Sequence, residues 1–120
     1  MKTAGKTNPE LINLIRDLKD AGRKNKAPVW RDIARRLSRP LNNWAEVNVG
    51  HLDRVCAEGD TVIVPGKVLA AGDIEKKINI AAWRFSSGAE TKITKAGGKI
   101  MNIGQMVKKN PKGKKLRIIG

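Results

Sequence analysis

Four arginines lie within nine residues of one short segment, at Arg31, Arg35, Arg36 and Arg39. The spacing of Arg31, Arg35 and Arg39 places them on one side of a helix, with Arg36 beside them. A guanidinium group presents a planar fork of donors that matches phosphate groups and base edges. The segment therefore predicts contact with nucleic acid. The alternative is a plain solvated face, although such a face usually mixes in more Lys and Glu.

A second basic cluster lies near the C-terminal end of the sequence and contains no acidic residue. Pro111 and Gly113 interrupt it, and no apolar residue lies between Val107 and Leu116. We expect this arm to be mobile in the free protein and to order on RNA, because nothing local fixes it. The alternative is a disordered tail that binds no ligand. The cluster consists of Lys108, Lys109, Lys112, Lys114, Lys115 and Arg117.

The whole sequence has 25 Lys and Arg against 11 Asp and Glu, which gives a formal net charge of +14. The charge is segregated, since residues 1–40 carry a net +7, residues 41–90 a net −2 and residues 91–120 a net +9. Segregated positive charge indicates a polyanionic partner, with nucleic acid ahead of an anionic membrane surface. The other candidate RNA contacts are Lys2, Lys6, Arg23, Lys24, Lys26, Asn43, Trp44 and Arg54.

The three tryptophans have different expected roles. Apolar neighbours at helical or strand spacing predict that Trp30 and Trp83 belong to the core. Trp44 directly follows the arginine-rich segment. It either stacks on an unpaired base or covers the edge of the core, and the sequence favours neither.

The residues that could catalyse a reaction are few. His51 is the one histidine and Cys56 the one cysteine, and no metal-ligand spacing surrounds them. We expect His51 to be structural or to touch phosphate, and Cys56 to be a small buried hydrophobe. The carboxylates of the middle segment lie at helix starts and turns, where acids are ordinary. The sequence therefore predicts no enzyme, no cofactor, no metal and no small-molecule substrate.

The surroundings of the protein also follow from composition. No run of about 18 apolar residues exists, and residues 1–5 lead into polar sequence rather than an apolar signal. A single cysteine fits a reducing compartment. We expect a cytoplasmic protein with no membrane partner.

Two helices are predicted in the first third of the chain. The first begins at Asn8-Pro9-Glu10 and ends at Gly22, a natural stop. The second begins near Pro28 and ends at Pro40. Its apolar face consists of Trp30, Ile33, Ala34 and Leu37.

The middle of the chain predicts a loop over residues 41–46 and a short helix near Leu52–Cys56. Thr61–Val64 is a β-branched strand, and Pro65-Gly66 is a turn that leads to a second extended stretch, Lys67–Ala71. A Pro-Gly turn matches hairpin twist poorly, so we do not expect a regular hairpin.

The last third predicts alternating strands and helices. Ile78–Phe85 is apolar on both faces, which indicates a buried strand. Ser86 caps a helix to about Ala96, and Gly97-Gly98 ends it. A strand over Lys99–Asn102, a helix over Ile103–Lys109 and a final strand near residues 116–119 follow.

Three stretches together resemble a known family. They are RRLSRPLNNWAEVNV at residues 35–49, VIVPGKVL at 62–69 and IAAWRFSSGAETKITKAGG at 80–98. The first two are similar to protein eighteen-e of the archaeal and eukaryotic large ribosomal subunit. The third resembles the signature that this family shares with bacterial large-subunit protein fifteen. The resemblance covers nearly the whole chain, and the short length looks archaeal.

The resemblance implies an α/β fold with an irregular β-β-α core, N-terminal helices and basic termini. On this basis residues 1–120 form a single domain, with basic helices at 1–40, an α/β core at 41–106 and a basic arm and final strand at 107–120. It implies a structural role in the large ribosomal subunit, with ribosomal RNA and neighbouring ribosomal proteins as partners and no cofactor. The alternatives are a non-ribosomal protein that binds or packs RNA or DNA, and an RNA-modifying enzyme.

Overall fold

The structure, a computed structural model, describes residues 8–40 and 44–120 and divides the chain into two units. The helical unit combines residues 1–44 with residues 104–114, and the sheet unit combines residues 45–103 with residues 115–120. Each unit is therefore built from two separate stretches of sequence. The mixed α/β class with N-terminal helices is confirmed.

Helix α1 (Pro9–Lys24) begins as predicted, because the Asn8 side chain accepts from the backbone N of Glu10 at 2.8 Å and of Leu11 at 3.4 Å. The prediction that Gly22 ends this helix is wrong, since α1 continues to Lys24. Gly22 is buried, and a Cβ placed on it would lie 2.7 Å from Cγ of Arg31. The glycine thus serves the close approach of the next helix rather than a stop.

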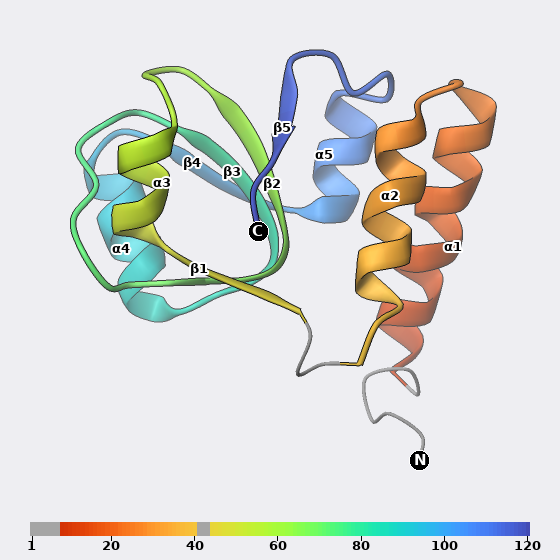
Figure 1. Cartoon of the computed structure of the whole chain (residues 1–120), viewed down its shortest axis with the longest axis horizontal. Coiled ribbons are helices and arrows are strands. Elements are labelled where there is room, and N and C mark those ends of the chain that lie inside the picture. Colours follow the sequence, from red (N-terminus) through yellow and green to blue (C-terminus); the bar gives the residue numbers. More distant parts are fainter. Residues whose placement is uncertain (1–7, 41–43) are drawn as a thin grey trace. The chain divides into compact units, whose positions relative to one another are not determined.

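Helix α2 (Pro28–Leu37) buries the predicted apolar face completely: Trp30, Ile33, Ala34 and Leu37 are each 0% exposed. It ends three residues before Pro40, and the Ser38 hydroxyl donates to the carbonyl of Ala34 at 2.8 Å. The predicted third helix of this unit is α5 (Ile103–Lys109). Figure 1 shows α1, α2 and α5 as the three helices that make up most of this unit.

The sheet unit contains β1 (Ala45–Asn48), α3 (Val49–Val55), β2 (Thr61–Leu69), β3 (Asn79–Phe85), α4 (Ser87–Lys95), β4 (Lys99–Asn102) and β5 (Leu116–Ile118). Every strand pair among the described residues is parallel. The strand order is β1-β2-β3-β4, and β5 pairs with β2 (Figure 1). The predicted final strand, the Lys99–Asn102 strand and the Ser86-capped helix are confirmed.

Strand β2 differs from the prediction at its centre. Pro65-Gly66 does not separate two extended stretches, because β2 runs through it from Thr61 to Leu69. The pairing with β3 shifts register between Val64 and Lys67, and this irregularity accommodates a proline that has no N–H to donate. Gly66 is required there, since a Cβ would collide with the carbonyl oxygen of Ala45 on β1.

The irregular centre lets one strand accept two partners in succession. Strand β5 pairs with the first part of β2, over Thr61–Ile63, and β1 pairs with the last part, over Gly66–Leu69. The core of the sheet unit includes Val62, Val64 and Val68 from β2. Strand β3 is buried over Ile80–Ala82. The prediction that Trp83 belongs to the core is wrong, because Trp83 is partly exposed and lies outside the buried core, with the Arg84 guanidinium carbon 4.4 Å from the centre of its ring.

Candidate RNA interface

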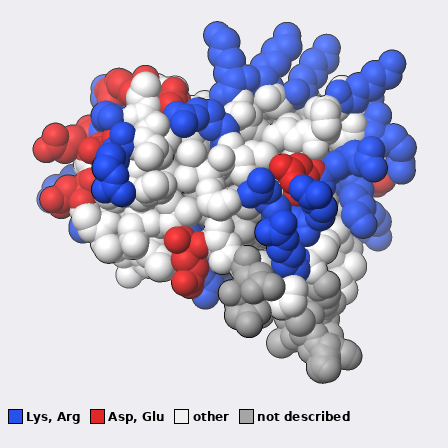
Figure 2. Space-filling model, in the orientation of Figure 1, with Lys and Arg blue, Asp and Glu red and all other residues white. Residues whose placement is uncertain are grey.

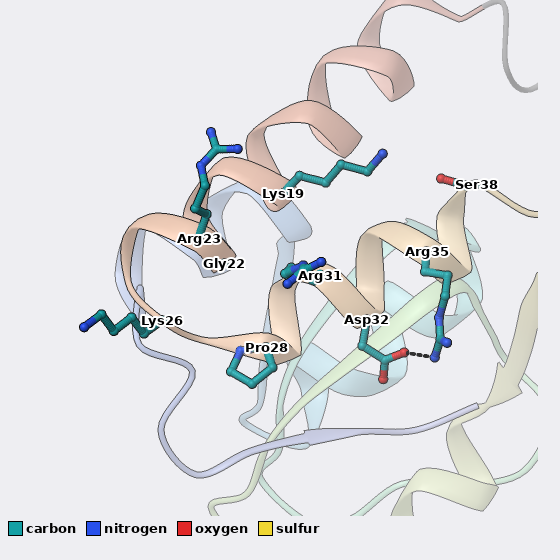
Figure 3. Close-up of a pocket in the computed structure, with 9 residues that line it drawn as sticks. All are labelled: Lys19, Gly22, Arg23, Lys26, Pro28, Arg31, Asp32, Arg35 and Ser38. Atoms are coloured by element: carbon teal, nitrogen blue, oxygen red, sulfur yellow. Dashed lines mark hydrogen bonds and ion pairs between the residues drawn. The ribbon is translucent and has the colours of Figure 1, made fainter.

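An open groove of about 1170 Å³ lies between α1 and α2 in the helical unit. Five cationic side chains line it against one carboxylate, that of Asp32. Figure 3 shows Lys19 from α1 and Arg31 from α2 facing the space between the helices, whereas Lys26 extends away from it. Its cations are Lys19, Arg23, Lys26, Arg31 and Arg35.

Arg31 is the cation whose position the fold determines most directly. Its Cγ lies where a side chain on Gly22 would stand, so the aliphatic stem crosses α1 at close range. Among the described residues no hydrogen-bond or ion-pair partner is found for its guanidinium group, and the residue is exposed. Because the aliphatic part of Arg31 is held in place while its guanidinium group is accessible, the side chain loses little conformational entropy when it binds a ligand.

Asp32 reduces the availability of its neighbours. Its Oδ1 accepts from Arg35 at 2.7 Å and from Arg36 at 3.5 Å. The hydrogen bond from Arg35 is the main reason that the pKa of Asp32 lies below its usual value, and burial partly opposes this shift. The Arg35 side chain stays 72% exposed, whereas that of Arg36 is only 28% exposed. Arg35 lines the groove while its guanidinium group is turned towards Asp32 (Figure 3), and Arg36, which does not line the groove, also contacts Asp32.

The basic arm is held by contacts that the sequence did not reveal. The Trp30 indole N–H donates to the carbonyl of Pro111 at 2.7 Å. The Asn110 side chain donates to the carbonyl of Lys114 at 2.9 Å and accepts from its N–H at 3.2 Å. Gly113, with φ of 65°, lies against Val29. The expectation that nothing local fixes the arm is wrong, because Asn110 binds Lys114, and Trp30, which is distant in sequence, also binds Pro111.

The other predicted contacts of the helical unit that the structure describes do not line the groove. Lys24 and Arg39 are exposed, and Lys108, Lys109, Lys112 and Lys114 are exposed along α5 and the arm. Lys2, Lys6 and Asn43 lie outside the described residues. Trp44 is 9% exposed and its indole N–H donates to the carbonyl of Arg39 at 3.0 Å, which favours a packing role over base stacking.

Three predicted contacts belong to the sheet unit. The Arg117 guanidinium binds the carboxylate of Asp60 and the carbonyl of Val55, both at 3.1 Å, so it ties β5 to the end of α3. Arg54 Nη2 lies 3.1 Å from Nδ1 of His51. Lys115 is exposed. The structure thus assigns Arg117 an internal contact and places Arg54 beside His51.

Two acidic side chains of the sheet unit accept hydrogen bonds from loop backbone, an ordinary structural role for acids near turns. Asp53 accepts from the backbone N of Glu75 at 3.0 Å and of Lys76 at 3.1 Å, and Glu58 accepts from that of Lys77 at 2.7 Å. The hydrogen bonds from the backbone N–H groups of Glu75 and Lys76 lower the pKa of the Asp53 carboxyl group. Cys56 is buried as predicted, and burial raises the pKa of its thiol.

The described residues contain no group of three or more His, Cys, Asp or Glu side chains that could hold a metal ion. No helix within residues 8–40 and 44–120 is long and apolar enough to cross a membrane.

Sequence reasoning left Lys19 out of the candidate contacts. The signal was present, since Lys19 and Arg23 are four residues apart on the polar side of α1. What the sequence could not supply is the pairing of that side with Arg31 and Arg35 of α2. Figure 2 shows Lys and Arg crowded on the visible surface of α1 and α2, whereas acidic and basic residues are mixed over α3 and α4.

Comparison with known proteins gives one consistent result. Residues 46–101 match a family model described as ribosomal proteins 50S-L15, 50S-L18e and 60S-L27A. Large ribosomal subunit protein eL18 of Methanopyrus kandleri is 52% identical over 120 residues, covering 96% of this chain and 94% of the relative. Those of Methanoregula boonei and Methanococcus maripaludis are 48% and 41% identical, with at least 98% of both chains covered.

Proposed function

We propose, since this chain belongs to the family of large ribosomal subunit protein eL18, that its helical unit is the part that binds ribosomal RNA. Members of the family are structural ribosomal proteins and not enzymes, so the chain is a structural constituent of the large ribosomal subunit.

The observation that carries the proposal is the groove between α1 and α2. Five cations line it, and its one carboxylate, that of Asp32, binds Arg35 and Arg36. Arg23 binds the exposed carboxylate of Asp20 at 2.7 Å. The potential in the groove is therefore strongly positive, and the closest fit to it is a chain of phosphates. Arg31 adds a positioned guanidinium fork that can hold one phosphate through two hydrogen bonds.

Binding to large-subunit ribosomal RNA tests the proposal. Lys19→Ala with Arg31→Ala removes two groove cations, and we expect the affinity to fall about tenfold or more, with a smaller salt dependence. The matched control is Lys95→Ala with Lys99→Ala, which removes two exposed cations from the sheet unit. We expect the control to bind nearly as tightly as the unchanged protein. Equal losses in both double variants would show that net charge, rather than the groove, sets the affinity.

The partners of the sheet unit follow from a different property. Residues 45–103 and 115–120 hold ten basic and seven acidic residues, a net +3, which suits contact with proteins as well as RNA. Because the relatives are proteins of the large subunit, we assign neighbouring ribosomal proteins to this unit as partners. Protein crosslinks from Lys95 and Lys99 in intact large subunits would test it, and their absence would contradict it.

A further inference from the structure

The two basic surfaces of the helical unit lie on opposite sides of the same helix. On one side of α2, Arg31 and Arg35 face the groove. On the other side, Val29 contacts Gly113 of the arm and Trp30 binds the carbonyl of Pro111. Successive residues of an α-helix are rotated by about 100°, so Val29 and Arg31 point about 200° apart.

We propose that the helical unit binds two separate segments of RNA at once, one in the groove and one along the basic arm, with α2 between them. This inference rests on the proposed function, because it assumes that the groove binds RNA. A double helix is stiff over its own width, so a short duplex contacts one side of α2 at a time. Two occupied sides therefore mean two RNA segments held in fixed relation.

The arm is suited to this role because it is ordered before RNA arrives. Its N-terminal end continues from α5, whose last turn carries Lys108 and Lys109. Its middle is fixed to α2 through Pro111 and Gly113, and the Asn110 side chain closes the loop on Lys114. The backbone is thus held on the α2 side, while the exposed side chains of Lys112 and Lys114 are available to a ligand.

No acidic side chain competes for these lysines within the arm. Residues 104–114 hold four lysines and no Asp or Glu. Among the described residues no hydrogen-bond or ion-pair partner is found for any of the four ammonium groups. Exposed ammonium groups on a fixed backbone bind phosphates as point charges, without bidentate geometry. The groove is richer in arginine, so the two sides differ in chemistry as well as position.

Energy transfer between two RNA molecules tests the proposal directly. The probe is one short A-form RNA duplex, prepared in two batches that carry a donor and an acceptor dye. The full chain is added to an equal mixture, with duplex in excess to limit networks of several proteins, and the mass of the complex is measured by sedimentation. We expect transfer in a complex of one protein and two duplexes.

Three double variants separate the sides. Lys19→Ala with Arg31→Ala should abolish transfer while one duplex still binds, and Lys112→Ala with Lys114→Ala should do the same from the other side. Lys95→Ala with Lys99→Ala removes equal charge from the sheet unit, and we expect transfer to persist. Combining the groove and arm substitutions should remove most duplex binding.

Two results would overturn the inference. One is a complex of one protein and one duplex with no transfer, which would leave the groove proposal standing. The other is transfer that falls equally in all three double variants, since this would reflect unspecific coating by a cationic protein. If the unchanged protein bound no duplex at all and no large-subunit RNA, the proposed function itself would fail first.

Discussion

The two units of the chain use their charged residues for different purposes. The helical unit holds fifteen basic and four acidic residues, a net +11, and the sheet unit holds ten and seven, a net +3. In the sheet unit many charged groups bind its own backbone. Lys76 donates to the carbonyls of Asp53 at 2.6 Å and Cys56 at 2.8 Å, and Lys92 donates to those of Ala70 at 2.8 Å and Gly72 at 2.6 Å.

The difference teaches that a basic residue indicates a nucleic-acid contact only where the fold leaves its charge available. A lysine that donates to two carbonyls keeps its charge but has one N–H donor left and a fixed position, whereas an exposed lysine without such acceptors can offer all three donors to a phosphate. Arg117 illustrates this within the predicted basic cluster, because its guanidinium holds Asp60 and Val55.

Loss of a buried tryptophan should give the largest effect and should separate the units. Trp30 is 0% exposed, so Trp30→Ala should cost about 3–5 kcal/mol of unfolding free energy. Trp83→Ala in the sheet unit should cost less, about 1–2 kcal/mol, because Trp83 is only partly buried and part of its contact is with the exposed Arg84. Denaturant unfolding of both variants measures this. Equal costs would mean that Trp83 is buried in solution.

The salt dependence of RNA binding should follow from the helical unit. If it neutralises on the order of 6–10 phosphates, the slope of log K against log salt should be near −5 or steeper. Lys112→Ala with Lys114→Ala should reduce that slope by about 1–1.5, whereas Lys95→Ala with Lys99→Ala should leave it nearly unchanged. Filter binding across a salt series gives the slopes. A slope near −1 in the unchanged protein would contradict a phosphate-binding surface on this unit.

A glycine exchange tests whether the arm is held against α2. Gly113→Ala meets both a φ of 65° and the Val29 side chain, while Gly59→Ala meets a φ of 85° in open space. Each substitution should lower the free energy of unfolding by about 1 kcal/mol, because alanine is strained at a positive φ. Gly113→Ala should lower it further, because its new methyl group would clash with the Val29 side chain. Hydrogen exchange should show protected amides at Gly113 and Lys114 in the unchanged protein, and their loss in Gly113→Ala alone. Fast exchange at both amides before any substitution would instead support a mobile arm.

Acid should have the smallest and most local effect. The pKa of Asp32 is lowered mainly by the bond from Arg35, so its stabilising contribution is full above its unfolded pKa and is lost as pH falls through the folded value. Asp32→Asn should therefore lower Tm slightly near pH 7, where the charged pair is intact, and should flatten the fall of Tm below about pH 4. Thermal melts over a pH series measure this. A steeper fall of Tm with acid in the variant would mean that ionised Asp32 does not stabilise the folded protein.

Local signals predicted most of the elements, and the failures share one cause. The caps at Asn8 and Ser86 and the buried face of α2 depend on neighbours in sequence, and all are confirmed. Gly22, Pro65-Gly66 and the arm were misjudged because their contacts come from elsewhere: Arg31, the strands beside β2, and Trp30. Propensity cannot show such contacts, since a glycine that stops a helix and one that admits a neighbour look alike.

The candidate site was only partly predictable for a similar reason. Helical periodicity identified Arg31 and Arg35 as one polar face, and charge segregation identified the arm. Whether a given cation is available depends on the nearest carboxylate or carbonyl, which tertiary structure decides. The contacts of Arg36 with Asp32 and of Arg117 with Asp60, and the place of Lys19 in the groove, are of this kind.

The discontinuous make-up of the two units has a consequence for the order of events during synthesis. A ribosome releases the chain from its N-terminal end, but residues 104–114 complete the helical unit and residues 115–120 complete the sheet unit. Helices α1 and α2 therefore emerge long before the arm that packs on Trp30, and β2 emerges before its partner β5. Neither unit can complete its contacts until residues 104–120 have been made, so the closing contacts of both form within the same short interval, when that stretch emerges.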